Sequence, residues 1–193
     1  MEKNHVANAV KAMVIGGSAG SLQVLFNLLP LLQNHLPFAM ILVLHRRHSA
    51  DSSLSELLST KTLLPTCEVE DKDRILPGHI YLAPADYHLL IEKDESFSLD
   101  YSEKINFSRP SIDVTFESAA EVYGPSLVAM LLSGANEDGT KGLSLVKKAG
   151  GTTIVQNPET AQMPYMPHHA MMHTVIDHVL DVRQMSHYIN NLR

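Results

Sequence analysis

Continuous runs of hydrophobic residues alternate along the chain with segments in which hydrophobic residues recur every three or four positions. The continuous runs have the length expected of buried strands and cover residues 9–16, 38–44, 126–134 and 152–156. The periodic segments predict helices over residues 21–35, 49–60, 111–124, 138–151, 163–174 and 182–192. Between them, residues 79–101 are typical of short strands joined by tight turns at 84–86 and 93–95.

This alternation of strands and helices predicts an α/β protein with a mostly parallel sheet that is covered by helices on both faces. We expect a single domain over residues 1–193, because the length fits one sizeable hydrophobic core and no internal repeat is present. Right-handed crossovers bring the loops after parallel strands to the same edge of the sheet. Three such loops carry candidate chemistry, with Ser18, His45 and Asp138.

Composition limits the class of protein. The formal net charge of -6 argues against a protein that binds mainly the nucleic-acid backbone. Cys67 is the single cysteine, so no internal disulfide can form, and we expect its thiol to be a small buried group in a reducing, cytoplasmic compartment. The N-terminal residues lack a signal-peptide pattern, and the longest apolar run is well below the roughly 20 residues of a membrane span. We therefore expect no membrane insertion.

The stretch "VIGGSAGS" places Ser18 in a glycine-rich turn between a predicted strand and a predicted helix. Such a turn can bind a phosphate, but the glycine spacing matches neither the dinucleotide fingerprint nor the P-loop. An NADP site that uses Arg46 and Arg47 is a minor alternative. The same residues match G-x-S-x-G, in which small neighbours let a nucleophilic serine stand on a sharp turn. A third interpretation makes Ser18 only the N-cap of the helix.

The other two strand-end residues favour the nucleophile. A serine hydroxyl needs a base, and an imidazole base needs a carboxylate that fixes its tautomer. His45 ends the run "ILVLH", and Asp138 lies in "SGANEDGTKG" between a strand and a helix. We therefore predict a Ser18–His45–Asp138 triad.

With these segments in place, the sequence resembles the catalytic domain of the CheB-type chemoreceptor protein-glutamate methylesterases. The resemblance rests on "VIGGSAGS", "LVLH", "LPGHIYLAPADYHL", "RPSIDVTFESAA", "LLSGANEDGTKGL" and "KKAGGTTIVQNPETAQMPYMPHHAM", which follow the family's order from about residue 13 to about residue 180. It implies a three-layer α/β/α fold with a doubly wound, largely parallel sheet. It also implies that Ser18 is the nucleophile, His45 the general acid and base, and Asp138 its orienter.

The resemblance further implies a substrate and partners. The substrate is a γ-glutamyl methyl ester on the cytoplasmic helices of a methyl-accepting chemoreceptor, and related enzymes also deamidate receptor glutamines. No cofactor and no metal are implied. The family usually carries a receiver domain that is absent from this sequence, so phosphorylation control would require a separate response-regulator protein, unless the sequence is a piece of a longer chain. Backbone N–H groups of Ala19 and Ala135 are the candidate oxyanion donors, and Arg109 is a candidate residue at the border of the substrate cleft.

Two departures from the family pattern leave an alternative open. The aspartate loop contains Ala135, Asn136 and Glu137, and Glu137 adds a like charge beside the catalytic carboxylate. Ala19 and Ser21 replace a threonine and a glycine of the family. A non-catalytic relative that binds receptors or signalling proteins is therefore the second hypothesis, and a nucleotide-binding module is the third.

The segment "PHHAMMH" places His168, His169 and His173 close together on a predicted helix. A spacing of four between two of them suits a metal, but no acidic or cysteine ligand stands beside them. We therefore interpret these histidines as structural or surface residues. In "SRPSID", Ser111 and Asp113 are interpreted as structural, with Ser111 as a helix cap.

Overall fold

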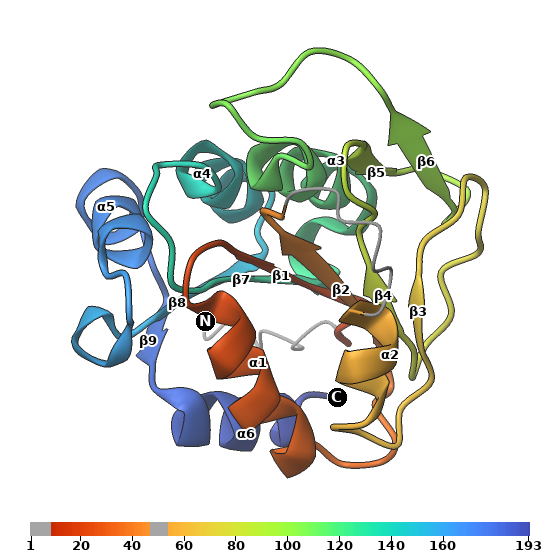
Figure 1. The fold of residues 1–193 in the computed structure, drawn as a ribbon, viewed down its shortest axis with the longest axis horizontal. Coiled ribbons are helices and arrows are strands. Elements are labelled where there is room, and N and C mark those ends of the chain that lie inside the picture. The colour runs from red at the N-terminus through yellow and green to blue at the C-terminus, as the bar shows by residue number, and fades with distance from the viewer. Residues whose placement is uncertain (1–8, 47–53) are drawn as a thin grey trace, which may run out of the picture.

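The fold is a parallel sheet between two layers of helices, as seen in the computed structural model, which describes residues 9–46 and 54–193 (Figure 1). Within these residues the main sheet has seven strands in the order β3-β4-β2-β1-β7-β8-β9, and all neighbours pair in parallel. Its strands are β1 Ala12–Gly17, β2 Ala39–Leu44, β3 Thr66–Glu68, β4 Ile80–Leu82, β7 Leu127–Leu131, β8 Thr152–Gln156 and β9 His178–Leu180. The chain builds outward from β1 in one direction and then, from β7, in the other.

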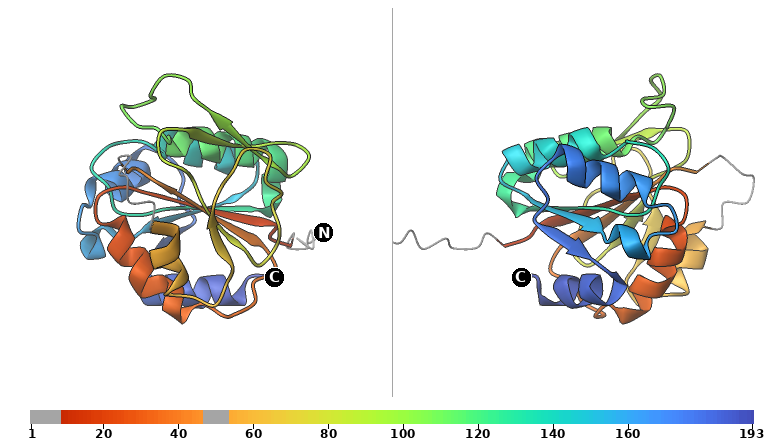
Figure 2. Two further views of the ribbon diagram at one scale, coloured as in Figure 1. Left: turned by 45° about the vertical axis from the view of Figure 1, so that its right-hand side comes forward. Right: turned by 90° about the vertical axis from the view of Figure 1, so that its left-hand side faces the viewer.

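Helices cover both faces of this sheet, which makes three layers (Figure 2). One face is covered by α3 Ile112–Tyr123, α4 Thr140–Lys148 and α5 Tyr165–His173. The other face is covered by α1 Ser21–Leu28, α2 Leu54–Ser59 and α6 Val182–Asn191. Two apolar cores result, and β1, β2, β7 and most of β8 contribute to both because almost all of their residues are buried. The predicted three-layer α/β/α fold with a doubly wound parallel sheet is confirmed.

A separate antiparallel hairpin stands apart from the main sheet. Its strands β5 His88–Ile91 and β6 Phe97–Asp100 pair with each other, and the hairpin packs its apolar side chains against α3. Both predicted turns are present, with Asp86 at φ 66° and Glu95 at φ 58°. After β6, the chain leaves the body in a loop of residues 101–111, which projects at the top of Figure 1 before α3 begins.

Several predictions at the level of elements need correction. The helix predicted over 21–35 ends at Leu28 and continues as a 3₁₀ turn, Leu29–Leu31, because Pro30 has no N–H to extend an α-helix. The predicted helix over 49–60 lies partly outside the described residues. Cys67 is exposed, not buried, because β3 is a short strand at the sheet edge. No helix among the described residues is both long and apolar enough to cross a membrane.

Candidate active site

The carboxyl ends of β1 and β2 bring Ser18 and His45 side by side. These strands pair in parallel with Gly17 opposite Leu44, so the next residue on each strand faces the other. The His45 N–H donates to the Gly17 carbonyl at 3.0 Å, and the Ser18 N–H donates across to the Ser133 carbonyl at 2.9 Å. The sheet therefore fixes the two backbones at the point where the strand order reverses, which is the usual location of sites in open α/β sheets.

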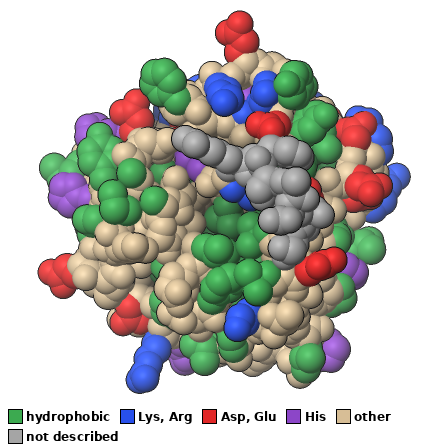
Figure 3. Space-filling view, viewed as in Figure 1, with side chains coloured by type: hydrophobic (Ala, Val, Ile, Leu, Met, Phe, Trp, Pro, Cys, Tyr) green, Lys and Arg blue, Asp and Glu red, His purple; other side chains and the backbone are tan. Residues whose placement is uncertain are grey.

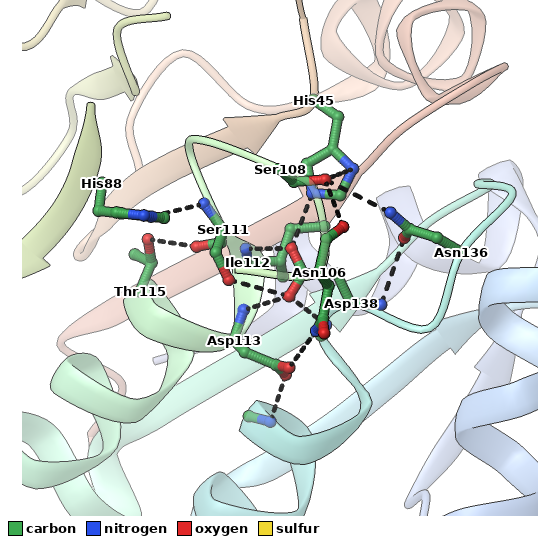
Figure 4. A network of polar contacts seen from close by, with 12 residues as sticks. His45, His88, Asn106, Ser108, Ser111, Ile112, Asp113, Thr115, Asn136 and Asp138 are labelled. Carbon is green, nitrogen blue, oxygen red and sulfur yellow. Dashed lines mark hydrogen bonds and ion pairs between the residues drawn. The ribbon is translucent and has the colours of Figure 1, made fainter. Parts of the chain in front are cut away.

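Asp138 comes from the loop between β7 and α4 and is fully buried. Its Oδ2 atom lies 2.8 Å from Nε2 of His45, whose side chain is 11% exposed. This is the shortest contact that the imidazole makes in the network of Figure 4. Because a carboxylate only accepts hydrogen bonds, the contact places a proton on Nε2 and leaves the Nδ1 lone pair of neutral His45 as the base.

The start of α3 supplies three further hydrogen bonds to this carboxylate. The N–H of Ile112 donates to Oδ2 at 2.7 Å, and the N–H of Asp113 donates to Oδ1 at 3.0 Å. The hydroxyl of Ser111 also donates to Oδ1, at 3.0 Å. Ser111 is the N-cap residue of α3, but its side chain makes no cap hydrogen bond, so that part of its predicted role is wrong. The Asp138 carboxylate caps the helix instead, from a distant part of the chain.

These contacts set the charge of two neighbouring carboxyl groups. Burial acts to raise the pKa of Asp138, but the hydrogen bonds from His45 and from the α3 backbone outweigh it, and its pKa lies below the ordinary value. Asp113 is also buried, accepts from the Gly142 N–H at 2.6 Å and feels the charge of Asp138. Burial is the main cause that raises the pKa of Asp113, and the negative charge of Asp138 adds to it. Together they raise this pKa to about 6.

The other nitrogen of His45 faces a serine that the sequence pattern did not single out. The hydroxyl of Ser108, in the loop of residues 101–111, lies 3.3 Å from Nδ1, and the side-chain amide of Asn136 donates to the same hydroxyl at 3.4 Å (Figure 4). Among the described residues the Ser18 hydroxyl makes no hydrogen bond with the imidazole. The structure thus joins His45 to Asp138 and places Ser18 beside the pair, with Ser108 at the nitrogen that the triad assigns to Ser18.

The glycine turn is built as a strand-to-helix elbow. Gly20 has φ 84° and is the N-cap of α1, so Ser18 is not the cap. The Ser21 hydroxyl folds back onto the Ser18 carbonyl at 2.6 Å, and the Ser133 hydroxyl donates to the Ala19 carbonyl at 2.7 Å. Within the described part of the chain, the Ala19 N–H donates to no acceptor. That N–H, at the N-terminal end of α1, remains available to an anion beside Ser18.

The loop that carries the second candidate oxyanion donor, the Ala135 N–H, packs against the serine turn. Ala135 is exposed in the loop after β7, whereas the N–H of its neighbour Gly134 already donates to the Met163 carbonyl at 3.0 Å. A Cβ on Gly134 would lie 3.0 Å from the Cβ of Ser18 and 2.5 Å from the Met166 sulfur. The glycine is therefore required for the close approach of this loop to the serine turn.

Arg109 and Arg46 line a cavity of about 360 Å³ that opens onto His45. Arg46 pairs with Glu68 and also donates to the Ala83 carbonyl at 3.4 Å. Arg47, the other half of the NADP alternative, lies outside the described residues. An arginine already held by a carboxylate offers little to a 2′-phosphate, so the structure provides no support for that alternative.

Two histidines of α5, His169 and His173, contact each other, and His169 also contacts the neighbouring helix α4. His169 and His173 stack with ring centroids 4.0 Å apart, and His173 Nδ1 lies 2.8 Å from the His169 carbonyl. His169 Nδ1 also lies 3.1 Å from the Thr140 hydroxyl, and its Nε2 lies 3.8 Å from Glu137. Glu137, expected to influence the catalytic base, thus faces α5. Among the described residues no cluster of three or more His, Cys, Asp or Glu side chains is arranged to hold a metal ion.

Fold and site together define a doubly wound α/β protein with a histidine–carboxylate pair at its topological switch point. The CheB methylesterase family profile matches residues 13–189, and the chain belongs to this family.

Individual relatives agree with that assignment. A protein of Leptospira interrogans is 41% identical over 176 residues, which is 91% of each chain. The protein-glutamate methylesterase/protein-glutamine glutaminase of Thermotoga maritima is 36% identical over 173 residues, 88% of this chain and 50% of that protein. The crystal structure of the T. maritima CheB methylesterase catalytic domain superposes with a TM-score of 0.89 at 34% identity, over 95% of this chain and 98% of that one.

Proposed function

We propose that this protein hydrolyses γ-glutamyl methyl esters on a chemoreceptor, and the side-chain amides of receptor glutamines, through a Ser18–His45–Asp138 triad and an acyl-enzyme. The observation that carries the proposal is the buried Asp138 carboxylate, 2.8 Å from Nε2 of an imidazole that stands beside Ser18 at neighbouring strand ends. The names of the relatives, protein-glutamate methylesterase and protein-glutamine glutaminase, support the reaction class. The proposal includes a cytoplasmic location and control by a separate response-regulator protein.

The reaction would use the two nitrogens of His45 for different tasks. The Nε2–H group stays hydrogen-bonded to the Asp138 carboxylate. Nδ1 takes the proton of the Ser18 hydroxyl as Oγ attacks the ester carbonyl carbon. The resulting imidazolium is stabilised by the carboxylate, then gives its proton to the methoxy oxygen as methanol leaves. Nδ1 then takes a proton from water as the water oxygen attacks the acyl carbon, and returns that proton to Ser18 Oγ as the glutamate carboxylate is released. With a glutamine substrate the leaving group is ammonia.

The developing oxyanion would be held by backbone N–H groups. The Ala19 N–H stands at the N-terminus of α1 and has no acceptor among the described residues, so it is the first donor. The exposed loop at Ala135 supplies the second. In known hydrolases one such donor lowers the barrier by roughly 3–4 kcal/mol.

Ser18 is favoured over Ser108 as the nucleophile for two reasons. Parallel strands lie about 4.8 Å apart, so a rotation of the Ser18 side chain can direct its hydroxyl to the imidazole of the opposing His45. Ser18 also stands next to the Ala19 N–H, which has no acceptor among the described residues. Ser108, in contrast, lies in the loop of residues 101–111, and its hydroxyl donates to the Asn106 carbonyl at 3.3 Å. In this mechanism Ser18 replaces Ser108 at Nδ1 when substrate binds.

The test is release of methanol from a γ-glutamyl methyl ester peptide. Wild-type protein should release it with turnover, and Ser18→Ala should reduce the rate by at least three orders of magnitude. Ser59→Ala is the matched control, since Ser59 is an exposed serine whose hydroxyl donates to the Glu56 carbonyl within α2. Turnover by Ser18→Ala at the wild-type rate would exclude Ser18 as nucleophile. A wild-type protein that binds the peptide without turnover would establish the non-catalytic alternative.

A further inference from the structure

An exposed aromatic and cationic surface borders the site on the loop of residues 101–111. We call it the loop patch and define it as Tyr87, Tyr101, Lys104, Phe107 and Arg109. Phe107 is 98% exposed, and Tyr101 is 65% exposed. The Tyr87 and Tyr101 rings lie 5.5 Å apart, and the Arg109 guanidinium stacks on Tyr101 at 3.9 Å. Figure 3 shows Lys and Arg side chains between hydrophobic ones at the top of the view, with a carboxylate at the outermost point.

The conformation of the loop at Phe107 is unfavourable in two ways. Its phenyl ring leaves apolar surface in water, on the same loop patch as the exposed rings of Tyr87 and Tyr101. The backbone is also strained, because Asn106 and Phe107 have φ of 50° and 62°, in the left-handed region that non-glycine residues rarely adopt. Arg109 holds this conformation by donating to the carbonyls of Tyr101 and Ser102, at 3.2 and 2.6 Å. An exposed aromatic ring on a strained backbone, in a loop that hydrogen bonds hold in place, is typical of a binding segment.

The loop patch is continuous with the candidate active site. Lys104, Phe107 and Arg109 line the same cavity of about 360 Å³ as His45, and Ser108, between two of them, contacts the imidazole. A chain that covers Phe107 therefore lies directly over the reacting groups.

Charge indicates what kind of chain fits. The described part of the cavity lining contains the cations Arg46, Lys104 and Arg109 and one carboxylate, that of Asp86. Among the described residues, no carboxylate forms an ion pair with Lys104 or Arg109, while Arg46 has Glu68. Cationic groups that are only partly paired attract an acidic ligand and speed its association.

We infer that the loop patch is the docking surface for the substrate protein, and that it selects an acidic segment of that protein. Glutamates flanking the target residue pair with Lys104 and Arg109, and an apolar side chain of the same segment covers Phe107. This inference rests on the proposed function and adds the feature of the substrate that is recognised.

The experiment uses three probes that carry one γ-methyl glutamate each. Two are helical peptides in which the flanking residues are either glutamates or glutamines, and the third is N-acetylglutamate γ-methyl ester, which is too small to reach the patch. Wild-type kcat/KM should favour the glutamate-flanked peptide roughly tenfold at low salt, and high salt should weaken this preference. Lys104→Ala should remove most of the preference.

The aromatic anchor is tested with Phe107→Ser. The ratio of peptide to small-ester kcat/KM should fall roughly tenfold, as for truncation of a binding hot spot. Leu63→Ser and Lys148→Ala are the matched controls, since Leu63 is 78% exposed outside the patch and Lys148 is exposed at the end of α4. Binding of fluorescent versions of both peptides to the Ser18→Ala protein should show the same preference and the same losses.

The outcomes separate this inference from the proposed function. A wild-type protein that hydrolyses neither the peptides nor the small ester contradicts the proposed function, and peptide binding then decides on docking alone. Hydrolysis without a glutamate preference, or ratios unchanged in both patch variants, overturns the docking surface. A wild-type dimer that Phe107→Ser converts to monomer with an unchanged ratio also overturns it, because the patch would then bind a second copy of the chain.

Discussion

Replacement of Asp138 by asparagine tests the hydrogen-bond network most severely. The carboxylate accepts at Oδ2 from His45 and Ile112 N–H groups and at Oδ1 from Ser111, Asp113 and Gly139. An asparagine has one acceptor oxygen, and its NH₂ group must replace the other. Whichever way the amide is turned, its NH₂ group then faces at least two N–H donors.

The size of the effect follows from that count. Each buried donor left without an acceptor costs about 1–3 kcal/mol, and the loss of a buried charged partner costs about 3–5 kcal/mol in total. We therefore expect Asp138→Asn to lower the free energy of unfolding by about 3–5 kcal/mol near neutral pH. The amide also favours the wrong tautomer of His45, so turnover by the folded protein should fall by a factor of about 10³–10⁴.

Urea unfolding and methanol release on the same preparation provide the assay. Asp181→Asn is the matched control, because Asp181 caps α6 through the Gln184 N–H at 2.9 Å and asparagine caps equally well. The pKa of Asp138 is lowered by folding, so its contribution is present above its unfolded pKa and is lost as pH falls below about 4. The two proteins should therefore converge in stability in acid. A loss below about 1 kcal/mol with full turnover would refute the reasoning.

Three further changes follow from the same site. Folding raises the pKa of Asp113 to about 6, so the contribution of this group to the free energy of unfolding should fall by up to about 3 kcal/mol as pH rises from about 4 to about 6. Asp113→Asn should remove this contribution, and equal pH profiles of the two proteins in urea titrations would contradict it. Ser108→Ala removes one neutral hydrogen bond to the imidazole, so methanol release should change less than about tenfold, whereas loss of activity comparable to that of Ser18→Ala would assign the nucleophile to Ser108. Gly134→Ala forces a methyl group against Ser18 and Met166, and should lower kcat/KM about 10–100-fold with little change in circular dichroism; wild-type kinetics would show that the loop can shift freely.

The central strands could be predicted from the sequence because their environment leaves a direct pattern. Strands covered on both faces need apolar residues at every position, so β1, β2, β7 and β8 were recognisable as continuous runs. The edge strands β3 and β9 have three residues each and mixed burial, which gives no periodicity to detect. The hairpin β5–β6 was recognisable as strands, but its separation from the main sheet depends on packing against α3.

The candidate site was predictable only where chemistry coincides with a strand end. His45 and Asp138 stand beside recognisable strands, and topology alone brings such ends together. The cap that Asp138 forms on α3 depends on tertiary contact, because Ser111 is itself a favourable cap residue in local sequence. Ser108 gave no signal, since a serine in a polar loop is ordinary and its approach to His45 depends on where the loop of residues 101–111 packs.

The central claim is that Ser18 is the residue that becomes acylated. Incubation with a serine-directed fluorophosphonate, followed by peptide mass spectrometry, reads this out directly. We predict a single adduct on the peptide that contains Ser18, abolished by His45→Ala and retained in Ser108→Ala. An adduct on Ser108, or an adduct on Ser18 that forms equally fast without His45, would contradict the account.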